Sequence, residues 1–254
     1  MITLGIDLSS KATNTFACRI EWQKDGSGSI AKPEPHCDDE KLHSFISKAD
    51  SIGIDAPFGW PVPFSQAVAD WTIQGWIGEE SFQKSMRFRT TDIAVHGAVN
   101  FWPLSVSTDR IALPAMRAMA LLQKVGVGDK SGKHGRFFEV YPAATLKKWG
   151  LPFNGYKSDG QRGAGAALAR RGEIIAALSQ IFTNTRIPDS YAESDHALDA
   201  LVSSLTARAA ALGRTVQPDL AEEECARREG WIHIPSFASP AECVTASGSG
   251  ADGN

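Results

Sequence analysis

The sequence predicts an α/β protein with a mixed sheet, in which the first strands are antiparallel and the later strands are parallel, flanked by helices. Two short apolar segments, residues 2–8 and 51–55, have the length and composition of buried strands. A turn-rich segment and a helical pattern separate them, so the second strand should lie parallel to the first. Two long helical patterns, residues 165–182 and 194–212, can then cover the sheet.

The antiparallel strands are expected before residue 34. Residues 13–22 show mixed alternation of apolar and polar side chains and end at a turn-forming run, residues 24–28. Residues 29–33 form a third, short strand, and a helix with apolar side chains at helical spacing follows at residues 38–48. Three strands, a helix and a strand that returns beside the first are the element order of the RNase H fold.

A long insertion is predicted to separate the fourth strand from the next one. Prolines and tryptophans alternate over residues 56–104, which is typical of loops and short helices. A helix is expected at residues 111–124, because Pro114 falls in its first turn, and a strand is expected at residues 136–141. We expect residues 56–135 to form a lid over the sheet.

The length and composition allow one large core or two small ones, and with this element order we expect a single RNase H-like domain, residues 1–246, followed by a flexible tail, residues 247–254. No basic leader and no apolar stretch of membrane-spanning length is present, so we expect a cytoplasmic protein that does not enter a membrane. The formal net charge of −3 argues against a protein that coats nucleic acid through a general basic field. No C-x-x-C pair occurs, so reduced thiols are expected at Cys18, Cys37, Cys225 and Cys243.

Two predicted strands end in the same pattern, Leu-Gly-Ile-Asp at Asp7 and Ile-Gly-Ile-Asp at Asp55. Residues two apart in a strand share a face, so each aspartate should lie beside a glycine that leaves space next to the carboxylate. A carboxylate at the end of an apolar strand is costly to bury unless it is paired or binds a cation. Two such strands side by side therefore predict a site for Mg²⁺ or Mn²⁺, which prefer oxygen ligands.

Further acids are candidates for the same site. The predicted helix at residues 194–212 begins with Asp195 and His196 and carries Asp199 beside its apolar stripe. Asp195 has an alternative role as the helix cap, and His196 has an alternative place in solvent. Glu139 lies in an otherwise apolar strand, where it either joins the catalytic acids or forms a buried pair with an arginine.

Several segments, in order over nearly the whole chain, resemble one known family. This is the uncharacterised prokaryotic family of unknown function (DUF429), which is described as a predicted nuclease of the RNase H fold. The helix with Asp199 is also similar to the final helix of RuvC-type resolvases, in which a His or Asp three residues before an Asp ligates metal. The matching segments are residues 5–7 (GID), 54–61 (IDAPFGWP), 89–92 (RTTD), 139–143 (EVYPA), 196–201 (HALDAL) and 230–235 (GWIHIP).

The resemblance implies a phosphodiesterase with two divalent ions about 4 Å apart, which together stabilise the attacking water and the leaving oxygen. Asp7 would bridge both ions, and Asp55 would take the position of the second acid of that superfamily. Asp199, with Asp195 or His196, would complete the ligands.

Basic residues are candidates for substrate binding. Arg89 and Asp92 match a family motif, and we expect Arg89 to contact phosphate, since a guanidinium can donate two parallel hydrogen bonds. Residues 126–133 lack the spacing of a phosphate-binding loop and follow a predicted helix. A mobile basic loop with Lys133 and His134 is the favoured interpretation. This loop either forms a patch beside the site for a charged backbone, or its basic residues are scattered solvated side chains; the other members of the patch would be Arg136, Lys147, Lys148 and Lys157.

The sequence thus predicts a hydrolase, a metal-dependent nuclease that cleaves a phosphodiester of nucleic acid, with single-stranded and branched substrates both left open. A first alternative is a phosphotransferase of the sugar-kinase and actin type, because residues 5–10 (GIDLSS) also resemble the first phosphate loop of that related fold. A second alternative is a binding protein that has kept the fold without chemistry, which the negative net charge favours over a nuclease.

Overall fold

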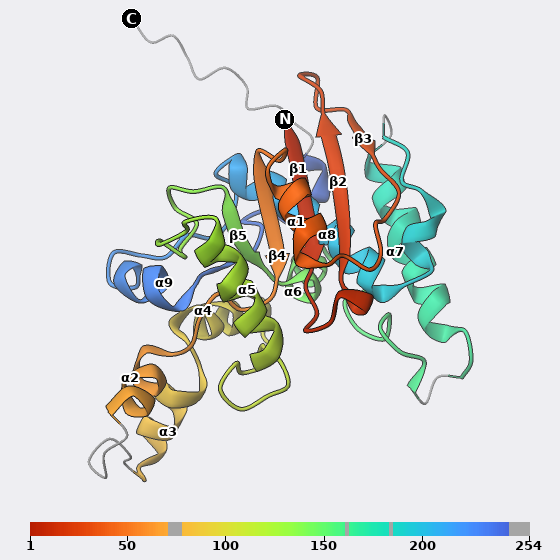
Figure 1. The fold of residues 1–254 in the computed structure, drawn as a ribbon. Coiled ribbons are helices and arrows are strands. Elements are labelled where there is room, and N and C mark those ends of the chain that lie inside the picture. Colours follow the sequence, from red (N-terminus) through yellow and green to blue (C-terminus); the bar gives the residue numbers. More distant parts are fainter. Residues whose placement is uncertain (71–77, 161–162, 183–184, 244–254) are drawn as a thin grey trace, which may run out of the picture.

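The protein is described by a computed structural model that covers residues 1–70, 78–160, 163–182 and 185–243. Its strands form one sheet in the order β3-β2-β1-β4-β5-β6 (Figure 1). β1 pairs with β2, and β2 with β3, in antiparallel fashion, whereas β1, β4, β5 and β6 are parallel neighbours. The strands are β1 (Ile2–Asp7), β2 (Phe16–Trp22), β3 (Gly28–Ile30), β4 (Ser51–Asp55), β5 (Phe137–Val140) and β6 (Ile232–His233).

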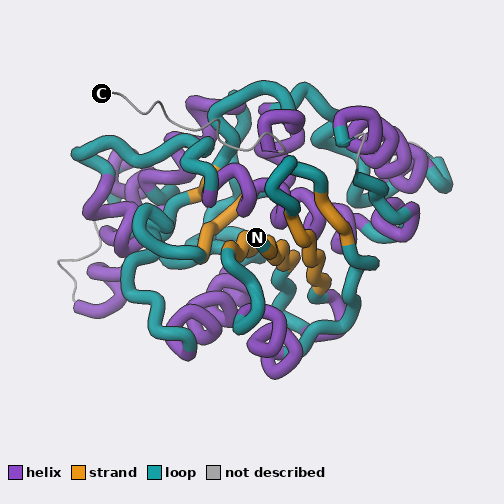
Figure 2. The backbone as a smooth tube through the Cα atoms, turned by 90° about the horizontal axis from the view of Figure 1, so that it is seen from above, coloured by secondary structure: helices purple, strands orange, loops and turns teal. Residues whose placement is uncertain are grey.

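The predicted fold class is confirmed: the protein has an RNase H-like mixed sheet flanked by helices. Helices cover both faces of the sheet (Figure 2). The helices are α1 (Asp39–Ile46), α2 (Val62–Asp70), α3 (Glu80–Arg87), α4 (Thr90–Val99), α5 (Ala112–Lys124), α6 (Pro142–Lys148), α7 (Ala166–Ile181), α8 (Asp195–Ala211) and α9 (Glu223–Glu229).

Alternate residues of the central strands pack into different hydrophobic layers. Leu4 and Ile6 of β1, with Ile54 of β4, belong to a cluster with Leu42 of α1 and Leu121 of α5. The other face of the sheet packs against α8, whose residues 197–210 are all buried. This burial explains why α8 is built from alanine, leucine and small hydroxyl residues.

Gly5 and Gly53 allow α8 to lie directly on the sheet. A Cβ atom at Gly5 would lie 2.0 Å from the carbonyl oxygen of Ala200, and one at Gly53 would lie 2.4 Å from that of Ser203. Both contacts are far shorter than van der Waals distance. The prediction that each glycine leaves space beside a carboxylate is therefore wrong, because the helix backbone fills that space.

The element boundaries follow the sequence pattern with a few differences. The second strand begins at Phe16 rather than residue 13, because Ala12–Asn14 form a 3₁₀ turn. The sequence pattern did not predict α6, α9 or β6, which are only seven, seven and two residues long. The predicted tail at residues 247–254 lies outside the described residues.

The segment between β4 and β5 contains α2 to α5, as short helices joined by loops. α2 and α3 extend away from the sheet, whereas α5 lies against it (Figure 1). Only part of the predicted lid at residues 56–135 therefore covers the sheet. No helix in residues 1–70, 78–160, 163–182 and 185–243 combines the length and hydropathy of a membrane span.

Gly5→Ala should lower the free energy of unfolding by about 3 kcal/mol or more, because the added methyl group forces the α8 backbone away from β1. Gly172→Ala is the matched control, since no atom lies within 4 Å of a Cβ built there in α7. It should raise stability by about 0.5–1 kcal/mol, because alanine favours a helix over glycine. Urea unfolding followed by circular dichroism measures both, and equal effects would contradict the close approach of helix and sheet.

Candidate metal centre

Three carboxylates converge where β1 and β4 end. Asp7 and Asp55 are paired neighbours in the parallel register of these strands, and Asp199 reaches them from α8. One oxygen of each of the three side chains lies within 4.8 Å of the others. The predicted convergence of acids from three distant parts of the chain is confirmed.

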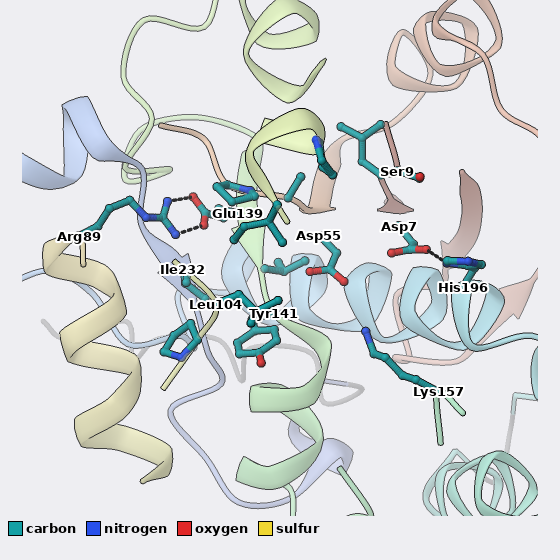
Figure 3. Close-up of a pocket in the computed structure, with 17 residues that line it drawn as sticks. Asp7, Ser9, Asp55, Arg89, Leu104, Glu139, Tyr141, Lys157, His196 and Ile232 are labelled. Atoms are coloured by element: carbon teal, nitrogen blue, oxygen red, sulfur yellow. Dashed lines mark hydrogen bonds and ion pairs between the residues drawn. The ribbon is translucent and has the colours of Figure 1, made fainter. Parts of the chain in front are cut away.

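Hydrogen bonds hold two of the three acids. The ring Nδ1 of His196 lies 2.6 Å from Asp7 Oδ2 (Figure 3). The hydroxyl of Tyr156 donates to Asp199 Oδ1 over 2.8 Å, and the ammonium of Lys157 lies 2.7 Å from Asp199 Oδ2. Each oxygen of Asp199 and one oxygen of Asp7 thus has a partner from this chain.

Asp55 differs from its neighbours. Within the described part of the chain, no donor lies within hydrogen-bonding distance of its carboxylate, although the side chain faces the same pocket as Asp7 (Figure 3). Burial raises the pKa of Asp55 well above its ordinary value; Lys157 opposes this shift, and the charges of Asp199 and Asp7 add to it. The ionised form of Asp55 is therefore the least well compensated charge of the cluster.

The remaining charges respond to the same cluster. Burial raises the pKa of Asp7 to about 6, although the hydrogen bond from His196 opposes the shift. That hydrogen bond raises the pKa of His196. Desolvation lowers the pKa of Lys157, but Asp199 and Asp55 outweigh it and hold the ammonium above its ordinary pKa. The cluster therefore favours bound cations and protons.

Asp7 and Asp55 open into a pocket of about 270 Å³. They lie on one side of it together with His196 and Lys157 (Figure 3). Apolar side chains from the inserted segment form an apolar wall of the pocket: Pro103, Leu104, Ile111 and Pro114. The inserted segment thus contributes part of the pocket lining.

Glu139 lines the same pocket, as does Arg89, but its carboxylate belongs to a second hydrogen-bond network. Its carboxylate accepts hydrogen bonds from Arg89 Nη1 over 2.9 Å and Nη2 over 2.7 Å, and from the Phe58 amide over 2.9 Å. Nε and Nη2 of Arg89 also donate to Asp92, and Nη1 donates to the carbonyl of Glu229. Every N–H of Arg89 is thus used inside the protein, which favours a structural role over the predicted phosphate contact.

The network also connects the inserted segment to the last residue of α9. Glu229, which is 3% exposed, accepts hydrogen bonds from the amides of Val62 and Thr90. These amides begin α2 and α4, so one carboxylate caps two helices. Of the alternatives for Glu139, the geometry favours the buried pair with an arginine.

The other predicted site residues lie outside the carboxylate cluster. Asp195 begins α8 and is not one of the clustered acids. Lys133, His134 and Arg136 precede β5, whose opposite end carries Glu139. Lys133 pairs with Glu223, and Arg136 donates to the carbonyl of Ile46. The structure therefore does not bring these three basic residues to the acids.

Sequence reasoning missed Tyr156, and it named Lys157 only as one lysine of a possible basic patch beside the site, not as a partner of Asp199. Both lie in the loop between α6 and α7, which has no apolar periodicity. The family-like segments also omit this loop. A lysine in a loop is most often solvated, so the sequence held no signal that would have placed this one beside Asp199.

Asp7→Asn should stabilise the metal-free protein by about 1–3 kcal/mol above pH 6, since it removes a carboxylate whose pKa is about 6 when folded and 3.8 when unfolded. Between pH 3.8 and pH 6 the Asp7 carboxyl is protonated in the folded state but ionised in the unfolded state. The ionised carboxylate therefore lowers the stability of the wild type fully above pH 6 and not at all below pH 3.8. Chemical unfolding in the presence of chelator, from pH 4 to 8, measures the difference in the free energy of unfolding between Asp7→Asn and the wild type. A difference that does not change with pH, or one that is as large in the exposed Asp70→Asn control, would contradict the prediction.

Arg89→Lys should lower the free energy of unfolding by about 3–5 kcal/mol, because lysine cannot satisfy both buried carboxylates in the fork geometry of arginine. Arg170→Lys, in an exposed pair with Glu173, should change it by less than about 0.5 kcal/mol. Chemical denaturation measures both variants. If Arg89 served only substrate binding, its variant would unfold like the control.

Comparison with known protein families matches residues 5–223 to the family described as "Protein of unknown function (DUF429)". No curated protein matches the chain, and no solved structure does. The matched range contains all three clustered acids, together with Glu139 and Arg89. The chain belongs to this family of unknown function, DUF429.

Proposed function

We propose that the protein is a metal-dependent phosphodiesterase that hydrolyses nucleic acid, using Mg²⁺ or Mn²⁺ held by the clustered carboxylates. The observation that carries the proposal is the convergence of Asp7, Asp55 and Asp199 within 4.8 Å, with Asp7 and Asp55 lining a pocket. Buried carboxylates repel one another unless a cation or protons compensate them.

The donor set fits a hard divalent cation. All three clustered residues offer carboxylate oxygens, which suit Mg²⁺ and Mn²⁺, and no thiol or second imidazole among the described residues joins the group. Asp55 supports the fit most directly, because it is a partly buried carboxylate that faces the pocket and accepts no hydrogen bond from the described residues. Asp55 and the free oxygen of Asp7 would hold the ion.

A divalent ion bound there would neutralise charge on a phosphate ester and lower the pKa of a bound water. Neighbouring side chains hold the carboxylates of this site in place. His196 fixes the rotamer of Asp7 through Oδ2, and Tyr156 does the same for Asp199 through Oδ1. The apolar wall at residues 103–114 limits the access of bulk water to the acids.

The size of the pocket supports a particular class of nucleic acid. A volume of about 270 Å³ with an apolar wall suits one nucleotide that has left its base stack better than an intact duplex. Single-stranded and branched substrates are therefore the favoured ones. The net charge of −3 supports contact through this local site rather than through a broad basic surface.

Asp55→Asn should reduce nucleic-acid cleavage at least about 100-fold, because it removes a proposed metal ligand. Loss of a residue that only hydrogen-bonds to a ligand typically reduces activity about 10–100-fold. Chelator-treated protein is given Mn²⁺ or Mg²⁺ and labelled single-stranded DNA, duplex DNA, a four-way junction and RNA, and the products are separated on gels. Asp70→Asn, which changes an exposed aspartate at the end of α2, is the control and should cleave like the wild type.

Cleavage that survives in Asp55→Asn, or that persists in chelator, would contradict the proposal. An ATP arm in the same assay detects the phosphotransferase alternative through metal-dependent release of ADP. Release of ADP without cleavage of any nucleic acid would replace the nuclease by that alternative.

A further inference from the structure

The hydrogen bonds around the acids divide the site into an occupied side and an open side. Both oxygens of Asp199 already accept a bond, one from Tyr156 and one from Lys157. On the other side, Asp7 Oδ1 and both oxygens of Asp55 accept none from the described residues. Because Asp7 and Asp55 are register partners on adjacent strands, these free oxygens lie next to each other.

The ammonium of Lys157 is a positive charge inside the carboxylate cluster. It lies 2.7 Å from Asp199 Oδ2, and Figure 3 shows it pointing from its loop toward Asp7 and Asp55. The side chain is 51% exposed, yet its charged end faces the acids rather than open solvent. The ammonium thus lies where a second cation bound to Asp199 would otherwise be.

The loop that carries Lys157 is held in place. Tyr156, the preceding residue, is 1% exposed and packs in the core beneath α8. Arg171 of α7 donates from Nη1 to the Tyr156 carbonyl over 2.6 Å and from Nε to the Ala192 carbonyl over 2.7 Å. Arg171 thus connects the loop to α7 and to the segment before α8, and it fixes the backbone at the residue that precedes Lys157.

We propose that the site binds one divalent ion, between Asp7 and Asp55, and that Lys157 supplies the second positive charge, fixed on Asp199. The proposal rests on the proposed function and differs from the two-ion site that the sequence resemblance implies. The fixed ammonium balances the third carboxylate. It also presents a donor to the pocket, where it can contact an oxygen of a bound phosphate.

The test counts bound ions and needs no substrate. Chelator-treated protein is titrated with Mn²⁺ while electron paramagnetic resonance measures the free ion. The wild type should bind one Mn²⁺ per chain, and two would overturn the proposal without any variant. Lys157→Met should bind two, because the vacated position and the uncompensated Asp199 then accept an ion. A count of one in Lys157→Met would also overturn it.

Two further variants distinguish the effect of the positive charge of Lys157 from the effect of replacing a lysine side chain. Lys157→Arg keeps the positive charge and should bind one ion, and two ions would overturn the proposal. Lys48→Met changes an exposed lysine after α1, on the far face of the sheet, and should match the wild type. Circular dichroism confirms that each variant is folded before its ions are counted.

The same titration distinguishes this proposal from the proposed function. If the wild type binds no Mn²⁺ at all, the metal-dependent function itself fails. If it binds two ions and cleaves nucleic acid, the function stands and the role of Lys157 falls. Loss of the single ion in Asp55→Asn supports its position between Asp7 and Asp55.

Discussion

The close contact between α8 and the two central strands is the constraint on which the site depends. Gly5 and Gly53 remove the side chains that would separate them, so the helix backbone rests on β1 and β4. Thr3 and Ser51 reinforce the contact through hydrogen bonds to Ser204 and to the carbonyl of Ala207. Asp199 then reaches Asp7 and Asp55 by virtue of its place on the helix. If α8 lay farther from β1 and β4, Asp199 would not reach Asp7 and Asp55.

The fold and the site set opposing requirements at the same strand ends. The fold buries these ends, whereas the acids there are charged and repel one another. His196, Tyr156 and Lys157 relieve part of this conflict by contacting Asp7 and Asp199. The part that remains falls on Asp55, and under the proposed function a bound cation would relieve it.

The sequence predicted the features that depend on local pattern. The strand at residues 51–55 was predicted to the residue, and α8 to within one residue at each end, because apolar periodicity and strand-end acids are local signals. The acids Asp7, Asp55 and Asp199 followed from that pattern. The contacts of Lys157 and of Glu229 did not, since each joins residues more than forty positions apart in sequence through short or irregular segments. The particular partners of Arg89 were missed for the same reason, because Glu139 and Glu229 are also distant from it in sequence.

Glu229 also has a consequence for the order in which the molecule can assemble. It caps α2 and α4, yet it is synthesised more than a hundred residues after them. Until the ribosome has released this region, the first amides of both helices lack their partner and Arg89 lacks the carbonyl of residue 229. A chain that stopped just before α9 would contain every clustered acid and the contacts of Arg89 with β5, but the first turns of α2 and α4 would lack the acceptor that Glu229 provides.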